Sequence, residues 1–459
     1  MPKQDKGGSC RLEAFKFCYY HSTNVCSFYF IEYSLSERRK KNCFKSEVAD
    51  KSLVSKMSDV YDLCIIGAGM FGSAAARHAS ANPSCKVCLV GPNEPTDEER
   101  ADREIFSCHY DEGRITRVID SNPAYEILSK KSIKSYREIE ELSGIEFYSP
   151  VGLLCIGEKK GTYLEKLKQA ASVCDVPLVD LSYSNIFHKR YPYIKLKPDD
   201  CAILEDAGAG YISARNLVAA QKKVAKMQGC HIISEVVKEV QELHEKHGLH
   251  LTITEGGRKI FSKRILICTG AFTNFKNFMP LPKLKINALK ETVAFLEISK
   301  LQADIISSMP SIICMRESDP MGSYTLPAIK YPDGKYYLKI GHSEFTKSGS
   351  LEALSEITQW YLSKGDQKKV QYLSKALREM LPDVKVESIS SMTCVTTETP
   401  SGLPYIDRVT PTVTVAVAGN GVGAKLSEEV GRIAATLSLT GRWDSELERS
   451  QFKIIKDEN

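Results

Sequence analysis

Residues 61–72 read Tyr-Asp-Leu-Cys-Ile-Ile-Gly-Ala-Gly-Met-Phe-Gly, and this stretch decides the fold. The apolar run 61–66 predicts a short buried strand that leads directly into the pattern Gly-x-Gly-x-x-Gly. We expect an alanine-rich helix at 73–80 and a second buried strand at 86–90. A strand, a glycine-rich turn, a helix and a strand within about 30 residues are typical of a dinucleotide-binding unit.

Each glycine of this turn has its own physical task. Gly67 permits the tight turn, Gly69 lets the backbone approach a pyrophosphate, and Gly72 lets the helix pack on the strand. Met70 and Phe71 lie in the turn before the helix, whose N-terminus would hold the phosphate charge. The sequence therefore predicts that residues 67–72 bind the cofactor.

One position departs from the dinucleotide pattern. The second strand should end in an acidic residue that binds the ribose hydroxyls, but Val90 is followed by Gly91. Glu94, three positions after Gly91, is the predicted substitute.

Two further glycine turns indicate that the dinucleotide is FAD. An apolar strand, 264–268, ends in Thr269-Gly270, and a strand predicted at 412–418 leads into Gly419-Asn-Gly-Val-Gly423 and a helix at 426–437. NAD domains rarely need such a distant closing helix, whereas FAD domains are closed by distant pieces of chain. The predicted cofactor contacts from these turns are Thr269, Gly270, Gly421 and Gly423.

The composition excludes several classes of protein. The 459 residues are 42% hydrophobic and 26% charged, with no apolar run near the roughly 18–20 residues of a membrane helix. The chain has a formal net charge of +5. Residues 1–57 hold 11 Lys and Arg against 6 Asp and Glu, so all of this net charge lies there. The remaining chain is neutral, which predicts neither a nucleic acid nor a membrane partner and suits a small-molecule enzyme.

Residues 1–57 are predicted to be a disordered extension. They lack sustained periodicity, and charged residues interrupt any secretory apolar segment. Met57 is an alternative start, in which case the extension has no function.

The 15 cysteines predict neither disulfides nor a metal site. Four lie in residues 1–57, and most of the others are scattered through apolar runs, where a thiol acts as a small buried hydrophobe. No Cys-x-x-Cys pair is matched by a second one, so no metal is expected. We expect a reducing compartment, the cytoplasm.

The order of elements predicts an α/β fold with two discontinuous domains. A Rossmann-type FAD-binding domain is assembled from 58–135, 200–285 and 385–459. An α+β substrate domain with a mixed or antiparallel sheet is assembled from 136–199 and 286–384.

Five motifs occur in an order that resembles the sarcosine oxidase branch of the D-amino-acid-oxidase-type FAD-dependent oxidoreductases. This branch includes monomeric sarcosine oxidase, N-methyltryptophan oxidase, pipecolate oxidase and the fructosyl amino acid oxidases. The resemblance covers about residues 58–445. The motifs are GAGMFG at 67–72, GRITR at 113–117, LKIG at 338–341, CVTTETP at 394–400 and GVGAK at 421–425.

The resemblance implies a role for each charged residue of these motifs. Arg114 would lie beside the flavin, while Arg117 and Lys425 would hold the substrate carboxylate, for which guanidinium offers a bidentate grip. Lys339 would activate oxygen through its charge. From the strand pattern alone, Lys339 could equally face solvent. Cys394 would carry the flavin as a thioether, although a lone cysteine is more often a buried structural thiol.

Other predicted site residues match less closely. Tyr324 resembles the active-site tyrosine of the branch. His342 lies one position from the family's histidine, where Ser343 stands, and His109 precedes the arginines with a different spacing. The difference at Ser343 leaves the identity of the amine open.

The implied activity is oxidation of secondary or N-substituted amino acids, of the sarcosine or pipecolate kind. A hydride would pass from substrate carbon to flavin, the imine would hydrolyse, and O2 would be reduced to H2O2. A fructosyl-amine (deglycating) oxidase and a flavin-binding protein without turnover are the alternatives. We expect a monomer; relatives suggest the peroxisome, but the terminal Lys456-Asp-Glu-Asn459 is no Ser-Lys-Leu signal.

Overall fold

The computed structural model describes residues 60–182, 185–243, 248–319, 321–343 and 349–458. The predicted extension at 1–57 lies outside the described residues. Among the described residues, no helix has both the length and the apolar character needed to cross a membrane.

A six-stranded sheet in the described chain contains the predicted dinucleotide unit. Its strand order is β21-β22-β13-β1-β2-β9, with β21 antiparallel to β22 and every other pair parallel. Every residue of strands β1, β2, β13 and β22 is buried, and all except Thr414 are apolar, as expected of a parallel sheet covered on both faces. The strands are β1 (Leu63–Ile66), β2 (Val87–Val90), β9 (His231–Ile233), β13 (Ile265–Ile267), β21 (Tyr405–Arg408) and β22 (Val413–Val417).

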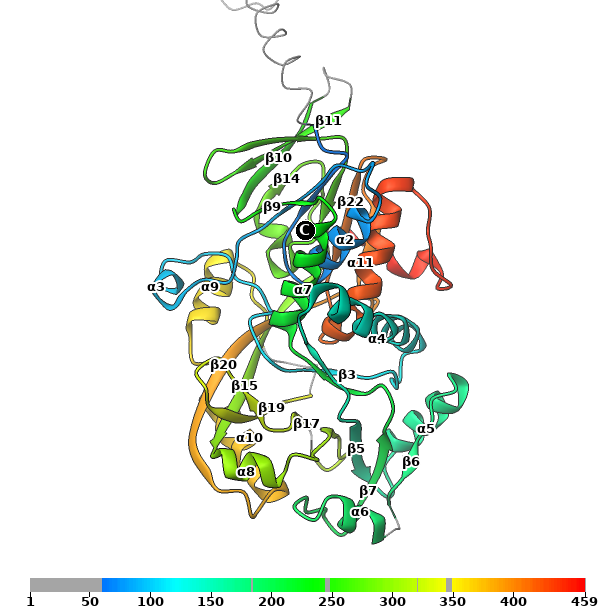
Figure 1. Cartoon of the computed structure of the whole chain (residues 1–459), viewed down its shortest axis with the longest axis vertical. Coiled ribbons are helices and arrows are strands. Elements are labelled where there is room, and N and C mark those ends of the chain that lie inside the picture. The colour runs from blue at the N-terminus through cyan, green and yellow to red at the C-terminus, as the bar shows by residue number, and fades with distance from the viewer. Residues whose placement is uncertain (1–59, 183–184, 244–247, 320, 344–348, 459) are drawn as a thin grey trace, which may run out of the picture. The chain divides into compact units, whose positions relative to one another are not determined.

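Helices from three distant parts of the chain lie together beside this sheet (Figure 1). They are α2 (Met70–Ser80), α7 (Ala214–Met227) and α11 (Gly423–Thr440). Alanines of α2 and aliphatic residues of α11 share one apolar core with β1 and β2. A Cβ on Gly431 would lie 2.5 Å from Cβ of Ala74, so this glycine allows α11 to approach α2 closely.

A second, larger sheet of the described chain has the order β20-β15-β19-β17-β16-β5-β7-β6, with β18 paired to β19. Only β5 and β16 are parallel among its pairs, so the sheet is mixed. The strands are β5 (Leu153–Glu158), β6 (Val179–Asp180), β7 (Asp200–Glu205), β15 (Asn287–Ile298), β16 (Ser311–Cys314), β17 (Ser323–Thr325), β18 (Ile329–Lys330), β19 (Tyr336–Gly341) and β20 (Val386–Glu398).

Alternate residues of these strands enter different cores. Leu154 and Ile156 of β5 pack with α6, α8 and α10, whereas Leu153 and Cys155 pack with α5. This is the period of two expected of a strand covered on both faces. The helices are α5 (Tyr163–Val173), α6 (Asn185–Arg190), α8 (Lys300–Ile305) and α10 (Gln367–Met380).

Smaller elements complete the described fold. One antiparallel set comprises β3 (Arg114–Thr116), β8 (Gly210–Ile212) and β4 (Tyr148–Ser149). Another sheet has the order β12 (Lys259–Ser262), β11 (Leu249–Thr254), β10 (Val237–Leu243) and β14 (Asn277–Phe278). The remaining helices are α3 (Asp97–Arg100), α4 (Pro123–Ser143), α9 (Leu354–Leu362), η2 (Gly270–Phe275) and η3 (Arg449–Phe452).

The predicted α/β fold class is confirmed. Two strands pair in a different sheet from the one that the predicted segments suggest. β7 and β20 fall in stretches predicted to belong to the FAD domain, but both pair within the larger sheet. β20 runs alongside β15 over twelve paired positions (Figure 1). The division into two domains stays a prediction.

Candidate functional site

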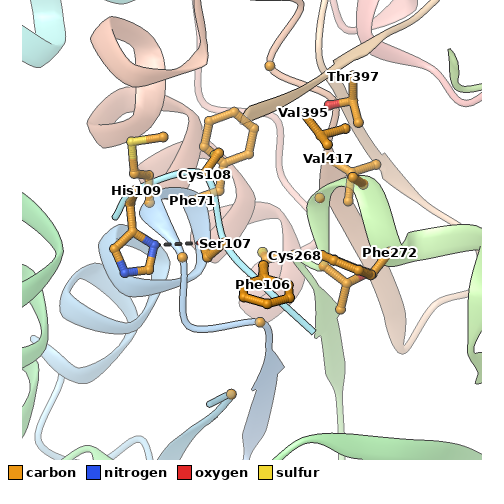
Figure 2. Close-up of a pocket in the computed structure, with 18 of the residues that line it drawn as sticks. Phe71, Phe106, Ser107, Cys108, His109, Cys268, Phe272, Val395, Thr397 and Val417 are labelled. Carbon is orange, nitrogen blue, oxygen red and sulfur yellow. Dashed lines mark hydrogen bonds between the residues drawn. The ribbon is translucent and has the colours of Figure 1, made fainter. Parts of the chain in front are cut away.

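A cavity of about 1360 Å³, counted to its open mouth, lies where the glycine turns converge. Its lining comes from several distant segments of the chain, among them the turns around Gly69, Thr269 and Gly421, so the cavity suits an extended ligand. Figure 2 shows apolar side chains around it from separate segments, including Phe71, Phe106, Phe272, Val395 and Val417.

The first glycine turn has no room for a side chain at Gly67 or Gly72. Gly67 has a φ of +103°, and a Cβ there would lie 2.3 Å from the carbonyl oxygen of Cys268. A Cβ on Gly72 would lie 1.8 Å from the carbonyl oxygen of Gly67. Gly69 caps α2 without a side-chain hydrogen bond, and the first turn of α2 holds no acidic residue. The helix N-terminus therefore faces the cavity with backbone N–H groups suited to a phosphate.

The absence of an acidic residue after β2, where Gly91 stands, has a steric reason. A Cβ on Gly91 would lie 2.5 Å from the backbone nitrogen of Ala68, so an acidic side chain has no space there. Glu94 does not line the cavity. Both of its carboxylate oxygens accept hydrogen bonds from Arg215 of α7, at 2.7 and 2.8 Å.

The other two glycine turns also border the cavity. Thr269, Gly270, Gly421 and Gly423 all line it. Asn420 takes a positive φ of 48° and connects two lining segments, because its Oδ1 accepts a hydrogen bond of 2.9 Å from the N–H of Thr399.

Cys394 and Arg114 lie side by side on the cavity wall. Nη2 of Arg114 is 4.0 Å from Sγ of Cys394, and the same nitrogen donates to the carbonyl oxygen of Cys108 at 2.8 Å. Cys108 also lines the cavity, so two thiols border it near one guanidinium. Sequence reasoning missed Cys108, for which no motif exists.

A buried charge cluster, here called the Asp111 centre, adjoins Arg114. Asp111 forms ion pairs with both Arg114 and Lys339, and it accepts a hydrogen bond of 2.8 Å from the hydroxyl of Tyr331. Nζ of Lys339 also donates to the carbonyl oxygen of Gly113 at 2.7 Å.

Lys339 is 1% exposed, which excludes the solvent-facing orientation that the strand pattern left open. Leu338 and Ile340 enter the core on the other face of β19. Burial, and then the charge of Arg114, lower the pKa of Lys339.

A second cluster, here called the Asp120 centre, joins Arg117, Asp120 and Lys425. Oδ2 of Asp120 lies 2.7 Å from Nζ of Lys425 and 2.8 Å from Nη2 of Arg117. Burial, followed by the charge of Arg117, lowers the pKa of Lys425 to about 8. Sequence reasoning missed both aspartates. Their only local signal is the three-residue spacing from Arg114 and Arg117.

Tyr324 packs near the Asp111 centre. Its ring centroid is 5.8 Å from Nζ of Lys339, and Gly341 leaves room for the ring, since a Cβ there would lie 2.5 Å from it. Burial raises the pKa of the Tyr324 hydroxyl.

The two predicted histidines lie in different surroundings. Nε2 of His342 is 2.9 Å from the carboxylate of Glu291, whereas its Nδ1 has no hydrogen-bond partner among the described residues. His109 lines the cavity and bonds Oγ of Ser107 through Nδ1 at 2.6 Å (Figure 2). Burial and nearby positive charges lower the pKa of His109 to about 3, so its ring is neutral.

One family model and two curated proteins match most of this chain. The family described as "DAO: FAD dependent oxidoreductase" matches residues 62–437. Peroxisomal sarcosine oxidase of Homo sapiens is 24% identical over 398 residues, which cover 84% of this chain and 94% of that protein. Monomeric sarcosine oxidase of Streptomyces avermitilis is 25% identical over 394 residues, covering 84% and 95%.

Two solved structures have a fold similar to that of this chain. NikD, described as an unusual amino acid oxidase essential for nikkomycin biosynthesis, superposes with a TM-score of 0.68 at 18% identity, over 86% of this chain and 98% of NikD. Amadoriase I of Aspergillus fumigatus, described as a fructosyl amine:oxygen oxidoreductase, gives 0.65 at 16% identity, over 85% and 89%.

Proposed function

The chain belongs to the DAO family of FAD-dependent oxidoreductases, and from this premise we propose that it oxidises secondary or N-substituted amino acids with O2, releasing H2O2. It is an FAD-dependent oxidoreductase acting on amine donors. The observation that carries the finer proposal is the buried Lys339, paired through Asp111 with Arg114, whose side chain lines the cavity.

The cavity residues fit FAD. The turn at 67–72, which has no space for a Cβ at Gly67 and Gly72, and the N-terminus of α2 suit a pyrophosphate, and aromatic and aliphatic side chains suit a flat ring system. FAD, when bound, supplies the hydride acceptor and the route for electrons to O2.

The chain's own groups would bind, orient and supply charge. Lys339 and Arg114 place positive charge beside the cavity, where it favours negative charge developing on the oxygen substrate. Arg117 and Lys425 are the proposed ligands of the substrate carboxylate. Tyr324 and His342 are proposed to border the amine. Cys394 is the proposed covalent attachment point of the flavin, supported by its position on the cavity wall.

Substrate turnover tests this proposal. Purified protein is offered sarcosine, pipecolate and fructosyl-glycine in separate reactions, and H2O2 is measured against O2 consumed. We expect equimolar peroxide with at least one N-alkyl amino acid and slower turnover of fructosyl-glycine. Preference for fructosyl-glycine would favour the deglycating alternative. Flavin-loaded protein that no amine reduces would favour a flavin-binding protein without turnover.

A further inference from the structure

Glu291 is a carboxylate of the larger sheet to which the proposed function gives no role. It lies on β15 directly opposite Cys394 of β20, so both side chains point to the same face of the sheet. Cys394 lines the cavity. The side chain of Glu291 is 21% exposed, whereas those of Asp111 and Asp120 are 1% and 7% exposed. Of these three carboxylates, Glu291 is therefore the one that a substrate can reach.

Two side chains hold the Glu291 carboxylate beside the cavity wall. Its Oε1 accepts a hydrogen bond of 3.3 Å from the hydroxyl of Thr396, which lines the cavity. Its Oε2 lies 2.9 Å from Nε2 of His342, and Nζ of Lys369 lies 3.4 Å from the same nitrogen. A carboxylate has about four lone-pair sites, so these two contacts leave acceptor capacity on Glu291 for a ligand.

The negative charge of Glu291 acts on the side of the site that is proposed to border the amine. Burial raises the pKa of Glu398, and the charge of Glu291 raises it further. Burial also raises the pKa of Tyr324, and Glu291 adds to this rise against the opposing charge of Arg114. The two carboxylates repel each other, and a cation bound beside them would relieve this repulsion.

The reacting amine itself is not the partner that this charge favours. An amine must be unprotonated to give up a hydride, whereas a carboxylate within about 4–6 Å stabilises the protonated form. A cationic group farther along the N-substituent gains from the same charge without slowing the reaction. Such a substrate also keeps its carboxylate for Arg117 and Lys425, as proposed above.

We propose that Glu291 is a specificity residue that binds a second cationic group, carried on the N-substituent of the substrate. The preferred substrates are then N-alkyl amino acids whose N-alkyl chain ends in an ammonium group. The inference rests on the proposed amine oxidase function and narrows its substrate class.

N-(3-aminopropyl)glycine and N-butylglycine form the test pair, because a terminal ammonium in one replaces a methyl group in the other. Glu291→Gln removes the charge and keeps the size of the side chain. A hydrogen bond to a charged group typically changes binding by roughly tenfold to a hundredfold. We expect kcat/KM for the aminopropyl compound to fall by about this factor in Glu291→Gln, mainly through KM. The value for N-butylglycine should change little.

Glu297→Gln is the matched control. Glu297 lies on the same strand and also contacts a cation and a hydroxyl, Lys335 at 2.8 Å and Ser388 at 2.6 Å. Six steps of strand, about 3.3 Å each, separate it from Glu291. The ratio of kcat/KM for the aminopropyl over the butyl compound should keep its wild-type value in this control. An unchanged or increased ratio in Glu291→Gln would overturn the proposal and leave Glu291 as a group that only orients His342.

Ligand binding judges Glu291 without turnover. 6-Aminohexanoate and heptanoate match the test pair in length and charge at both ends, but a methylene group replaces the reacting nitrogen. Calorimetry should show that 6-aminohexanoate binds wild type roughly tenfold more tightly than Glu291→Gln, with little change for heptanoate. Tighter binding of heptanoate than of 6-aminohexanoate to the wild type would overturn the proposal, and this comparison needs no folded variant. If neither N-alkyl glycine reduces the flavin, the proposed function fails for this class, and the 6-aminohexanoate result still judges Glu291.

Discussion

Two charge centres flank β3, and they are built from the same parts. In the Asp111 centre the aspartate precedes its arginine by three residues, and in the Asp120 centre it follows by three. Each aspartate binds its arginine and a distant lysine through Oδ2. In each, Oδ1 accepts from a neutral donor: the Tyr331 hydroxyl at 2.8 Å in one and the Asn122 N–H at 3.2 Å in the other.

The centres differ in what surrounds them. Arg114 of the Asp111 centre lines the cavity beside Cys394. Lys339 extends from β19 of the larger sheet and contacts Asp111. The Asp120 centre takes its lysine from α11 beside the six-stranded sheet, and Glu205 supplies a second carboxylate nearby. We propose that the Asp111 centre serves the cofactor and that the Asp120 centre serves the substrate.

The largest expected effect is on stability, and it should separate the two aspartates. Asp111→Asn leaves the buried Lys339 and the half-buried Arg114 without their shared carboxylate and should lower the free energy of unfolding by about 3 kcal/mol. Asp120→Asn should lower it less, because Glu205 remains to compensate Arg117 and Lys425. Urea unfolding of both variants measures the difference. An equal or larger loss in Asp120→Asn would mean that the centres do not differ as described.

Replacement of each lysine by methionine should affect a different half-reaction of the enzyme. Lys339→Met should slow reoxidation of the reduced flavin by roughly 10²- to 10³-fold, because it removes the positive charge beside the cavity. Flavin reduction by substrate should change far less. Lys425→Met should instead alter the KM of the amine and leave reoxidation near its wild-type rate. Stopped-flow traces of both steps make the comparison, and unchanged reoxidation in Lys339→Met would remove Lys339 from this role.

Stability should depend on pH through the Asp120 centre. The pKa of Lys425 is about 8 in the folded chain against its ordinary 10.5, so between these values the unfolded chain binds more protons. The free energy of unfolding of wild type relative to Lys425→Met should therefore rise with pH across this window, by about 3 kcal/mol at most. Unfolding at several pH values between 7 and 11 measures the difference in free energy of unfolding between wild type and Lys425→Met. A difference that does not change with pH contradicts the burial described for Lys425.

Substitution of either thiol beside Arg114 should change the stability of the protein least. The colour of the acid precipitate should nevertheless distinguish the two variants. Acid precipitation of wild type should leave the flavin in the pellet, and Cys394→Ser should release it to the supernatant. Cys108→Ser is the matched control, because Cys108 also lines the cavity, and its pellet should stay yellow. Flavin released from wild type by acid would show that no thioether forms.

Local elements could be predicted from the sequence. The strand expected at 86–90 is β2, and the helix expected at 73–80 lies within α2, because the glycine spacing and the apolar runs act over a few residues. The closing helix expected at 426–437 likewise lies within α11.

Pairings between distant segments could not be predicted. The sequence shows Asp111 and Asp120 three residues from their arginines, but only the fold brings Lys339 and Lys425 to them. Glu94 is held by Arg215 because α7 passes close to it, which no local pattern indicates.

The strand β20 shows another limit of sequence reasoning. Its Cys394 and the residues that follow border the cavity, as the motif suggested. The strand as a whole nevertheless pairs with β15 in the larger sheet. One strand therefore contributes to both the cavity wall and the larger sheet.

The most direct test of the central claim is an anaerobic titration of the purified protein with sarcosine and pipecolate, followed by its visible absorption spectrum. The account predicts a flavin spectrum that the amine bleaches and that returns when O2 is admitted, with equimolar H2O2. Protein that carries no flavin and cannot be reconstituted with FAD, or whose flavin neither amine reduces, would contradict it.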